Sequence, residues 1–352
     1  MRRRMRLKTV WVMLGVLLTL AALWVVFGKV SPPAKETRLA SRSAMEWLER
    51  AQESSGGFSA LRWGGRPEFD VGLTGLAAMA LLSGDSGSSL AHAIDFLVAS
   101  QSPEGRFGPD VREGTYNHGI ATVALLEAFE ARREERLRRA LEPALAYIRS
   151  TQCPEGGWGY LRGDPDGANT AATCWPLQAL LMARSLGWSD LDEPIGRALR
   201  HLSRVADHRG RLGYRRAGES PGGADALSSM GALCVLLARD ETQIPSRLRS
   251  RILDEVGRAS ARVSPGEDLY RDFFIASVVE ALPDSRRLRW RSDALKALGA
   301  AQVDAGPDRG SWEPRDAWAP AGGRVYATAF GALILEAGGR GRRVAEWQSG
   351  GS

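Results

Sequence analysis

Carboxylates, amides and one histidine stand at or near the start of the most apolar segments of this chain, where acid–base chemistry could take place. They are Asp70, Asn117 with His118, Asn169 with Thr170, Asp225, Asp268 with Asp272, and Tyr326. A carboxyl group that is buried without a partner has a raised pKa and can serve as a general acid. Asp and Asn are also the preferred N-caps of helices, where they bind unpaired amides. Both interpretations are open for these residues.

Three aspartates and one histidine are the candidates for catalysis. Asp225 and Asp272 lie inside or beside apolar segments, whereas Asp166 lies in a Gly-Asp-Pro-Asp-Gly turn, where carboxylates usually face water. His118 could act as a base, or it could hydrogen-bond a neighbouring repeat while Asn117 caps the helix. The candidate catalytic residues are therefore Asp166, Asp225, Asp272 and His118.

Motifs for other chemistry are missing from the sequence. There is no Gly-x-Ser-x-Gly, His-Glu-x-x-His or Walker loop. Cys153, Cys174 and Cys234 lack Cys-x-x-Cys spacing, which leaves at most one disulfide and no structural zinc site. We therefore predict no metal and no cofactor. The formal net charge of +6 is nearly accounted for by five basic residues at the N-terminus, so we expect no nucleic-acid partner.

A motif of glutamine, glycine and an aromatic residue recurs about every fifty residues. The copies are Gln52–Phe58, Gln101–Phe107, Gln152–Trp158 and the looser Gln302–Trp312. His208–Tyr214 occupies the corresponding place in a fourth repeat. A fixed period of this length is typical of repeat proteins, in which each unit buries its apolar face against its neighbours.

Two kinds of helix are expected to alternate between these motifs, because apolar residues recur at helical spacing. Segments with one charged face are Ala44–Gln52, Leu90–Gln101, Glu135–Gln152, Pro194–Val205, Pro245–Arg262 and Arg289–Gln302. Segments that are almost uncharged in their middle are Val71–Leu82, His118–Ala128, Thr170–Ala183, Ala226–Leu237, Leu269–Leu282 and Tyr326–Leu335. Amphipathic helices belong on an outside and apolar helices on an inside. The alternation predicts an all-α fold, an α/α toroid of six inner and six outer helices around a central cavity.

The motif at Gln152–Trp158 resembles the QW motif of squalene and hopene cyclases, which share an α/α toroid with the β subunits of protein prenyltransferases. The segments Asp70–Gly75 and Asn117–Ala121 are similar to those of membrane-anchored, squalene-cyclase-like repeat proteins of bacteria. The resemblance covers about residues 40 to 340. It implies the toroid and names no reaction by itself.

The residues that carry this family's chemistry are replaced in this chain. The resemblance places Asp166–Thr170 on the cyclase motif Asp-x-Asp-Asp-Thr, with Ala168 at the position of the acid. For the prenyltransferases, it places Leu269 near the zinc-binding cysteine and Ala327 at the zinc-binding histidine. Neither a standard cyclase acid nor a zinc site is therefore expected.

The N-terminal residues differ in composition from the rest of the chain. Several arginines and a lysine precede an uncharged apolar run that is long enough to cross a membrane nearly completely. The basic flank predicts a cytoplasmic N-terminus, with a cleaved signal peptide as the rival interpretation. We expect a basic cytoplasmic tail (1–8), a transmembrane signal anchor (9–29), a linker (30–40), an extracytoplasmic or periplasmic toroid (41–340) and a flexible tail (341–352).

The starts of the inner helices should converge on one mouth of the cavity and line it with polar and aromatic side chains. The expected cavity residues are Asn117, His118, Thr170, Trp175, Tyr270, Phe273 and Tyr326. We predict a single-pass inner-membrane protein whose cavity binds an isoprenoid or another apolar lipid without standard cyclase or zinc chemistry. The alternatives are an isoprenoid enzyme that uses an unorthodox acid and an extracytoplasmic protein-interaction scaffold. An open apolar pocket larger than about 300 Å³ would favour a ligand over a scaffold.

Overall fold

A computed structural model describes residues 35–84, 86–220, 224–238, 243–279 and 285–338, without the side chains of 224, 225 and 285–287. The chain divides into two compact units, Met1–Leu39 and Ala40–Ser352. The predicted basic tail (1–8), transmembrane segment (9–29) and C-terminal tail (341–352) lie outside the described residues. No helix in the described ranges combines the length and the apolar character needed to span a membrane.

Two sets of six α-helices alternate along the described chain. The amphipathic set is α2 (Lys35–Ala51), α4 (Gly87–Ala99), α6 (Glu135–Ser150), α8 (Asp192–Val205), α10 (Ser246–Ala259) and α12 (Ser285–Ala301). The apolar set is α3 (Asp70–Leu81), α5 (Gly114–Arg132), α7 (Thr170–Ser185), α9 (Ala224–Leu237), α11 (Leu269–Val279) and α13 (Ala319–Leu335). Two short 3₁₀ helices, η1 (Leu61–Trp63) and η2 (Pro67–Phe69), precede α3.

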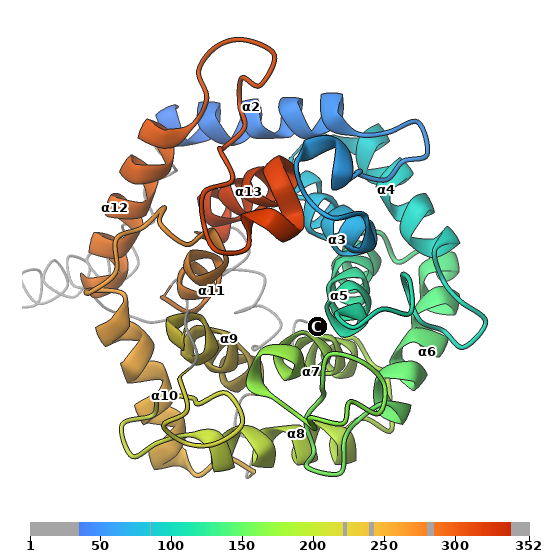
Figure 1. Ribbon diagram of the computed structural model, residues 1–352, viewed down its shortest axis with the longest axis vertical. Coiled ribbons are helices and arrows are strands. Elements are labelled where there is room, and N and C mark those ends of the chain that lie inside the picture. The colour runs from blue at the N-terminus through green and yellow to red at the C-terminus, as the bar shows by residue number, and fades with distance from the viewer. Residues whose placement is uncertain (1–34, 85, 221–223, 239–242, 280–284, 339–352) are drawn as a thin grey trace, which may run out of the picture. The chain divides into compact units, whose positions relative to one another are not determined.

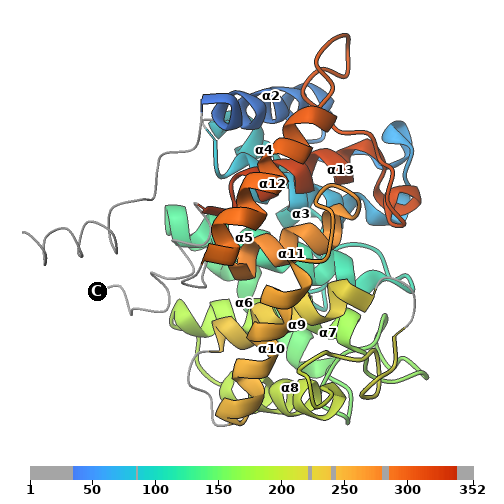
Figure 2. The same cartoon turned by 90° about the vertical axis from the view of Figure 1, so that its left-hand side faces the viewer.

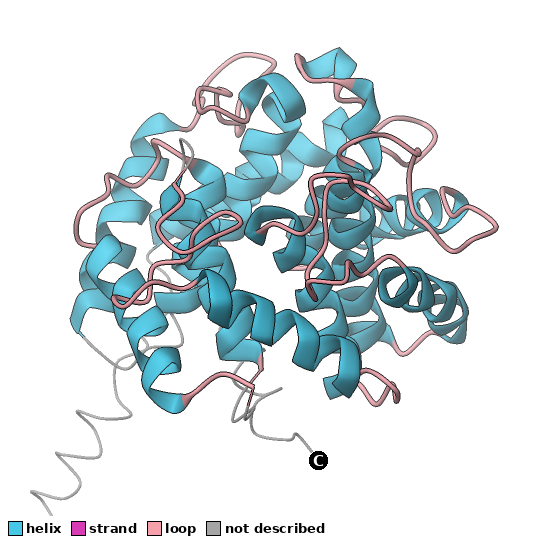
Figure 3. Ribbon diagram, turned by 60° about the horizontal axis from the view of Figure 1, so that its bottom comes forward, coloured by secondary structure: helices cyan, strands magenta, loops and turns pink. Residues whose placement is uncertain are grey.

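The apolar helices form an inner ring that the amphipathic helices surround (Figure 1). Each inner helix contacts the next one, from α3 through α5, α7, α9 and α11 to α13, and α13 returns to contact α3. Figure 2 shows helices of both sets from the side, and Figure 3 shows the loops that join them. The predicted α/α toroid is therefore confirmed within the unit Ala40–Ser352.

Burial explains why the two sets sort into two layers. Every residue of α3 from Val71 to Leu81 is buried, as are nearly all residues in the middle of α7. In α8 the buried residues recur at helical spacing on one face, and Ile195, Leu199 and Leu202 are among them. A helix that is apolar all round must be enclosed, whereas a helix with one apolar stripe can face water on the other side.

Several helices begin earlier than the sequence expectation, and the differences are largest for α2, α5, α12 and α13. α2 begins at Lys35, inside the stretch assigned to the linker (30–40), and α5 begins at Gly114 rather than His118. α13 begins at Ala319 rather than Tyr326, and its first turn is set off by Gly323, whose φ is 60°. Polar or glycine-rich first turns do not show the apolar spacing that marks a helix in sequence, so those turns were not predicted.

The motif glutamines tie each turn to the outer helix of the next repeat. Each side chain donates from Nε2 both to the carbonyl of the motif glycine and to a carbonyl of the following outer helix or its start. The second acceptors are Ser89, Ala140, Pro194 and, for Gln302, Ala40. The bond of 2.9 Å from Gln302 to Ala40 joins the last repeat to the first, and it closes the outer ring.

The fourth repeat lacks the glutamine and stabilises its turn differently. Ala206 stands at the glutamine position and forms an isolated bridge with Leu212. The motif of this repeat therefore begins two residues before the expected His208–Tyr214. The next residue, Asp207, accepts hydrogen bonds from the backbone amides of Arg209 and Arg211 through Oδ1. A carboxylate inside the turn therefore takes over part of the role that the glutamine has elsewhere.

Candidate binding cavity

A cavity of about 330 Å³ opens where the first turns of several inner helices meet. Its wall includes Leu73 and Leu76 of α3, Asn117 and Ile120 of α5, and the first half of α13. The aromatic lining residues are Phe69, Tyr116, Tyr160, Tyr270, Trp318, Tyr326 and Phe330. Among the expected cavity residues, Asn117, Tyr270 and Tyr326 lie in this lining.

Hydrogen bonds hold the hydroxyl groups of two lining tyrosines, Tyr270 and Tyr326. Tyr326 donates its hydroxyl to Oδ2 of Asp316 at 2.9 Å, and the same oxygen accepts the backbone amide of Leu269 at 3.1 Å. The Tyr270 hydroxyl accepts a bond of 2.9 Å from Nε1 of Trp175. The hydroxyl groups of Tyr270 and Tyr326 are therefore already paired with other groups of the protein.

Three phenols of the cavity wall carry no charge near neutral pH. Burial raises the pKa of the Tyr116, Tyr270 and Tyr326 phenols well above the usual value, so these phenols remain protonated. For Tyr326, the nearby carboxylate of Asp316 raises the pKa further. An uncharged aromatic surface suits an apolar ligand, and it can also attract a cation through the faces of its rings.

Charged side chains occur at the rim of the cavity. The Arg66 guanidinium lies 4.8 Å from the ring centre of Phe69, and the Arg112 guanidinium lies 5.8 Å from that of Tyr160. Glu113 is the only carboxylate among the described lining residues. Arg66 also pairs with Glu68 at 3.4 Å. The rim therefore combines two cations with one lining carboxylate.

Buried aromatic side chains pack against the lining residues of the cavity. Trp175 and Phe273 are fully buried and stack with ring centres 6.2 Å apart at an interplanar angle of 11°. Phe274 packs edge-on against Trp175, and Phe330 packs against Phe273. Both Trp175 and Phe273 were expected to line the cavity, and they form its packed floor instead. Trp175 and Phe273 contact the lining residues Tyr270 and Phe330 from the buried side, and we call the space they back the aromatic cup.

His118 does not lie in the cavity lining and is held at both ring nitrogens. Nδ1 accepts the backbone amide of Phe107 at 3.0 Å, and Nε2 lies 3.1 Å from the carbonyl of Ala144. The first contact requires an unprotonated Nδ1, which assigns the proton to Nε2. Burial lowers the pKa of His118 to about 4. A neutral imidazole with both nitrogens occupied has a structural role.

The bond that His118 accepts belongs to a series that runs around the ring. In other repeats an inner-helix hydroxyl accepts the backbone amide at the motif's aromatic position: the acceptors are Thr74, Thr173, Ser228 and Thr328. In the fifth repeat, Asp272 accepts the amide of Gly266 at 2.6 Å. His118 and Asp272 thus take over a position that a hydroxyl holds elsewhere.

Asp272 is buried and is paired with Arg271. Its Oδ1 accepts bonds from Nε and a terminal nitrogen of Arg271, both at 3.0 Å. Burial raises the pKa of Asp272 to about 6, although the adjacent Arg271 opposes that shift. Asp272 is not among the lining residues, so a ligand in the cavity would not meet its carboxyl group.

Two other expected site residues, Asp166 and Thr170, are absent from the cavity lining. Asp166 is exposed and pairs with Arg215 at 3.3 Å. Thr170 donates to the carbonyl of Gly213 at 2.6 Å and so joins two repeats. Asn117 lines the cavity, but its side chain also accepts the amide of Gly72 at 2.9 Å. The side chain of Asp225 lies outside the described residues.

The caps that the sequence suggested are present at two inner helices. Asn169 accepts the amide of Ala172 at 2.9 Å, and Asp268 accepts that of Arg271 at 2.9 Å. Ala168 precedes the Asn169 cap and is buried. Within the described ranges, no three His, Cys, Asp or Glu side chains come together as metal ligands.

Several lining residues were missed from the sequence because they belong to loops. Arg112 and Trp318 lie outside any periodic segment. Asp316, which holds the hydroxyl group of Tyr326, also lies in a loop. The sequence did contain a signal for one pair. Tyr160 and Tyr214 each lie two residues after the last position of a motif, with a glycine between, and their hydroxyl oxygens are 2.6 Å apart. A search for residues that repeat with the motif could have found them.

Comparison with known proteins supports the fold and leaves the activity open. No protein-family model matches the sequence. The chain is 31% identical over 208 residues to a drimenyl diphosphate synthase of Streptomyces showdoensis. That match covers 57% of this chain and 37% of the synthase, so the chain spans little more than a third of its relative.

Solved structures with similar folds have different activities. An α-1,6-mannanase of Salegentibacter sp. HEL1_6, in complex with α-1,6-mannotriose, matches with a TM-score of 0.65 at 11% identity, covering 87% of this chain and 99% of the mannanase. A type II terpene cyclase from Scytonema, in complex with merosterolic acid A, matches with a TM-score of 0.62 at 14% identity, covering 90% and 100%. At these identities the likeness shows the toroid alone.

Proposed function

We propose that this protein binds an isoprenoid or a similar amphiphile in the cavity at the mouth of its toroid. The observation that carries the proposal is the cavity of about 330 Å³, which is lined by seven aromatic side chains. Ligand pockets are typically concave and mostly apolar, with a few polar groups that fix orientation. The apolar part of the ligand would contact the aromatic wall, and an anionic head would lie near Arg66 and Arg112.

The positions of the carboxyl groups favour binding over cyclisation. A cyclase acid must reach the ligand, yet Asp166 is exposed on a turn and Asp272 is bound to Arg271 and Gly266. The family's acid position is Ala168. Glu113 is the one carboxylate in the described lining, and it is partly exposed at the rim.

The comparisons support the isoprenoid class of ligand. The relative from Streptomyces showdoensis is named as a synthase of drimenyl diphosphate, which combines an apolar skeleton with an anionic head. The Scytonema cyclase is also described in complex with geranylgeranyl dihydroxybenzoate, its substrate. A ligand of this kind would match both the aromatic wall and the cationic rim of this cavity.

The test compares two probes that share a tail and differ in their heads. Farnesyl diphosphate and farnesol are titrated into the full-length protein, its Arg112→Gln variant and its Ala321→Trp variant. Ala321 lines the cavity and is partly exposed, so an indole there can obstruct the cavity without entering the core. Arg112→Gln should weaken farnesyl diphosphate about tenfold and leave farnesol unchanged, because only the diphosphate meets the guanidinium.

The matched control removes a guanidinium from another surface. Arg139 is exposed on α6, away from the cavity lining, and Arg139→Gln should change neither affinity. An equal effect of Arg112→Gln on both probes would contradict the proposed position of the head. Formation of a cyclised product from either probe would favour the alternative of an isoprenoid enzyme.

We also propose that residues 9–29 anchor the protein in the inner membrane, with the toroid on the extracytoplasmic side. The support is the uncharged apolar run behind a basic flank. Alkaline extraction of membranes should leave the full-length protein in the pellet, whereas a variant that lacks residues 1–34 should be released. Release of the full-length protein as well would contradict the anchor.

A further inference from the structure

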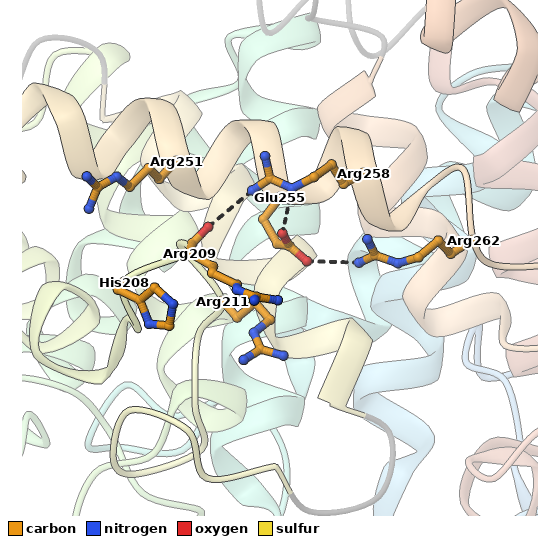
Figure 4. A pocket seen from close by; sticks show the side chains of 7 residues that line it. All are labelled: His208, Arg209, Arg211, Arg251, Glu255, Arg258 and Arg262. Atoms are coloured by element: carbon orange, nitrogen blue, oxygen red, sulfur yellow. Dashed lines mark hydrogen bonds and ion pairs between the residues drawn. The ribbon is translucent and has the colours of Figure 1, made fainter.

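A second cavity, of about 630 Å³, lies outside the inner ring, between the turn of the fourth repeat and α10 (Figure 4). Arg209 and Arg211 belong to the turn that follows α8, while α10 and the residues just after it supply the opposite wall. Its guanidinium groups belong to Arg209, Arg211, Arg251, Arg258 and Arg262. We call this site the arginine cavity.

The charges of the arginine cavity are only partly balanced. Glu255 is 5% exposed and accepts bonds of 2.9 Å from both Arg258 and Arg262. Arg211 pairs with Asp207 at 2.8 Å. No carboxylate in the described part of the chain pairs with the guanidinium of Arg209 or Arg251. Five cations and two carboxylates therefore leave an excess of about three positive charges.

The other repeats show which of these residues the architecture needs. The turn glycine of each well-formed repeat approaches the backbone of the next outer helix, at His92, Pro143, Arg197, Arg251 and Ser43. In three repeats an arginine lies seven residues after this contact, and it donates to a carbonyl of the neighbouring turn. These arginines are Arg50, Arg204 and Arg258. Arg258 therefore has a structural role that recurs around the ring.

Glu255 has no counterpart in the other repeats, whereas Arg251 corresponds to Arg197, which donates to the carbonyl of Cys153 in its neighbouring turn. Glu255 lies four residues after Arg251, the residue that the turn glycine approaches. At the equivalent place the other repeats have an aromatic or imidazole ring: Trp47, Phe96, Tyr147 and His201. Arg209 directly precedes the turn glycine, where two earlier repeats have Glu104 and Glu155 and the last repeat has Arg309. In this repeat a buried carboxylate, Glu255, therefore replaces the ring and holds the guanidinium groups of Arg258 and Arg262.

We propose that the arginine cavity binds the phosphate groups of an anionic ligand, a diphosphate or the headgroup of a phospholipid. Guanidinium groups bind phosphate oxygens through paired, charge-assisted hydrogen bonds. Glu255 fixes Arg258 and Arg262, while Arg209 and Arg251 keep their donors available. Nucleic acid fits less well, because the cations are gathered in one cavity and do not follow a stripe with aromatic residues.

The experiment titrates two soluble probes into the full-length protein by calorimetry at constant ionic strength. Inorganic pyrophosphate represents a free diphosphate, and monomeric dihexanoyl phosphatidic acid represents a lipid headgroup. The test variant is Arg209→Gln with Arg251→Gln. The control is Arg139→Gln with Arg289→Gln, which removes the same charge from exposed positions on α6 and α12. Thermal unfolding checks that both variants fold.

We expect saturable binding of at least one probe, weakened tenfold or more in the test variant and unchanged in the control. Tighter binding of pyrophosphate identifies a free diphosphate as the ligand chemistry, and tighter binding of phosphatidic acid identifies a headgroup. Equal weakening in test and control variants would overturn the proposal, because net charge would then explain the binding. Absence of saturable binding of both probes would also overturn it.

Discussion

His118 is the residue whose environment most clearly decides between two roles. Its ring accepts the amide of Phe107 and contacts the carbonyl of Ala144, and burial lowers its pKa from 6.5 to about 4. In the unfolded chain the imidazole binds a proton below about pH 6.5. Between these values the unfolded state binds more protons, so the free energy of unfolding falls as the pH falls.

The variant His118→Gln tests this role through the pH dependence of stability. The wild-type should lose about 3 kcal/mol of unfolding free energy from this group between pH 6.5 and about 4. At a pH near 8 the variant should be less stable by about 1–3 kcal/mol because a hydrogen bond to a buried group is lost. That difference should shrink or reverse near pH 4 in urea unfolding curves.

Exposed His92 supplies the control, and His92→Gln should run parallel to the wild-type at each pH. Comparing each variant with the wild-type also removes the opposing contribution of Asp272. Burial raises the pKa of Asp272, so its contribution to stability falls as the pH rises from 3.8 to about 6. A constant difference between wild-type and His118→Gln across this range would contradict the buried, neutral imidazole.

At the scale of the element, each turn is fitted closely to the next outer helix. Gly156 has a φ of +92°, and a Cβ added there would lie 2.5 Å from the carbonyl oxygen of Arg197. Gly163 has a φ of +67° and nothing within 4 Å of an added Cβ. The two glycines share a backbone region that disfavours side chains, and they differ in the space around them.

This pair gives a matched test of the packing between repeats. Gly163→Ala should cost about 1 kcal/mol of unfolding free energy, the usual penalty of a left-handed alanine. Gly156→Ala should cost about 3 kcal/mol or more, because the turn must also move away from α8. Chemical denaturation of both variants measures the difference. Equal losses would mean that the turn does not pack against the next repeat as described.

The helices and their layers could be predicted from the sequence because each depends on local apolar spacing. The charged face of α8 and the apolar length of α3 are visible in the residues themselves. The starts of α5 and α13 were not, since their first turns are polar or rich in glycine. The position of Gly323, with its φ of 60°, is decided by contacts with the loop before α3.

The cavity was predicted only in part, for a physical reason. Asn117, Tyr270 and Tyr326 were expected at the mouth because they stand near the start of inner helices. Periodicity does not tell whether an inner side chain lies beside an open space or packs against another ring, and Trp175 and Phe273 pack against each other. Arg112 and Trp318 reach the cavity from loops that have no sequence period.

At the scale of the toroid, the described inner helices form an aromatic cup at one mouth, and buried aromatic rings pack behind its lining. The packed floor of Trp175, Phe273 and Phe274 limits how deeply a ligand can enter. A ligand held here would keep its head near Arg66 and Arg112, within reach of water. This geometry is suited to holding an amphiphile by its tail.

The titration of farnesol into the wild-type protein and Ala321→Trp tests this account most directly. Farnesol has no charged head, so its binding reports on the aromatic cup alone. We expect saturable binding to the wild-type and an affinity at least about tenfold weaker when the indole obstructs the cavity. Equal affinity of the two proteins, or no saturable binding to the wild-type, would contradict the claim that the cavity binds an isoprenoid.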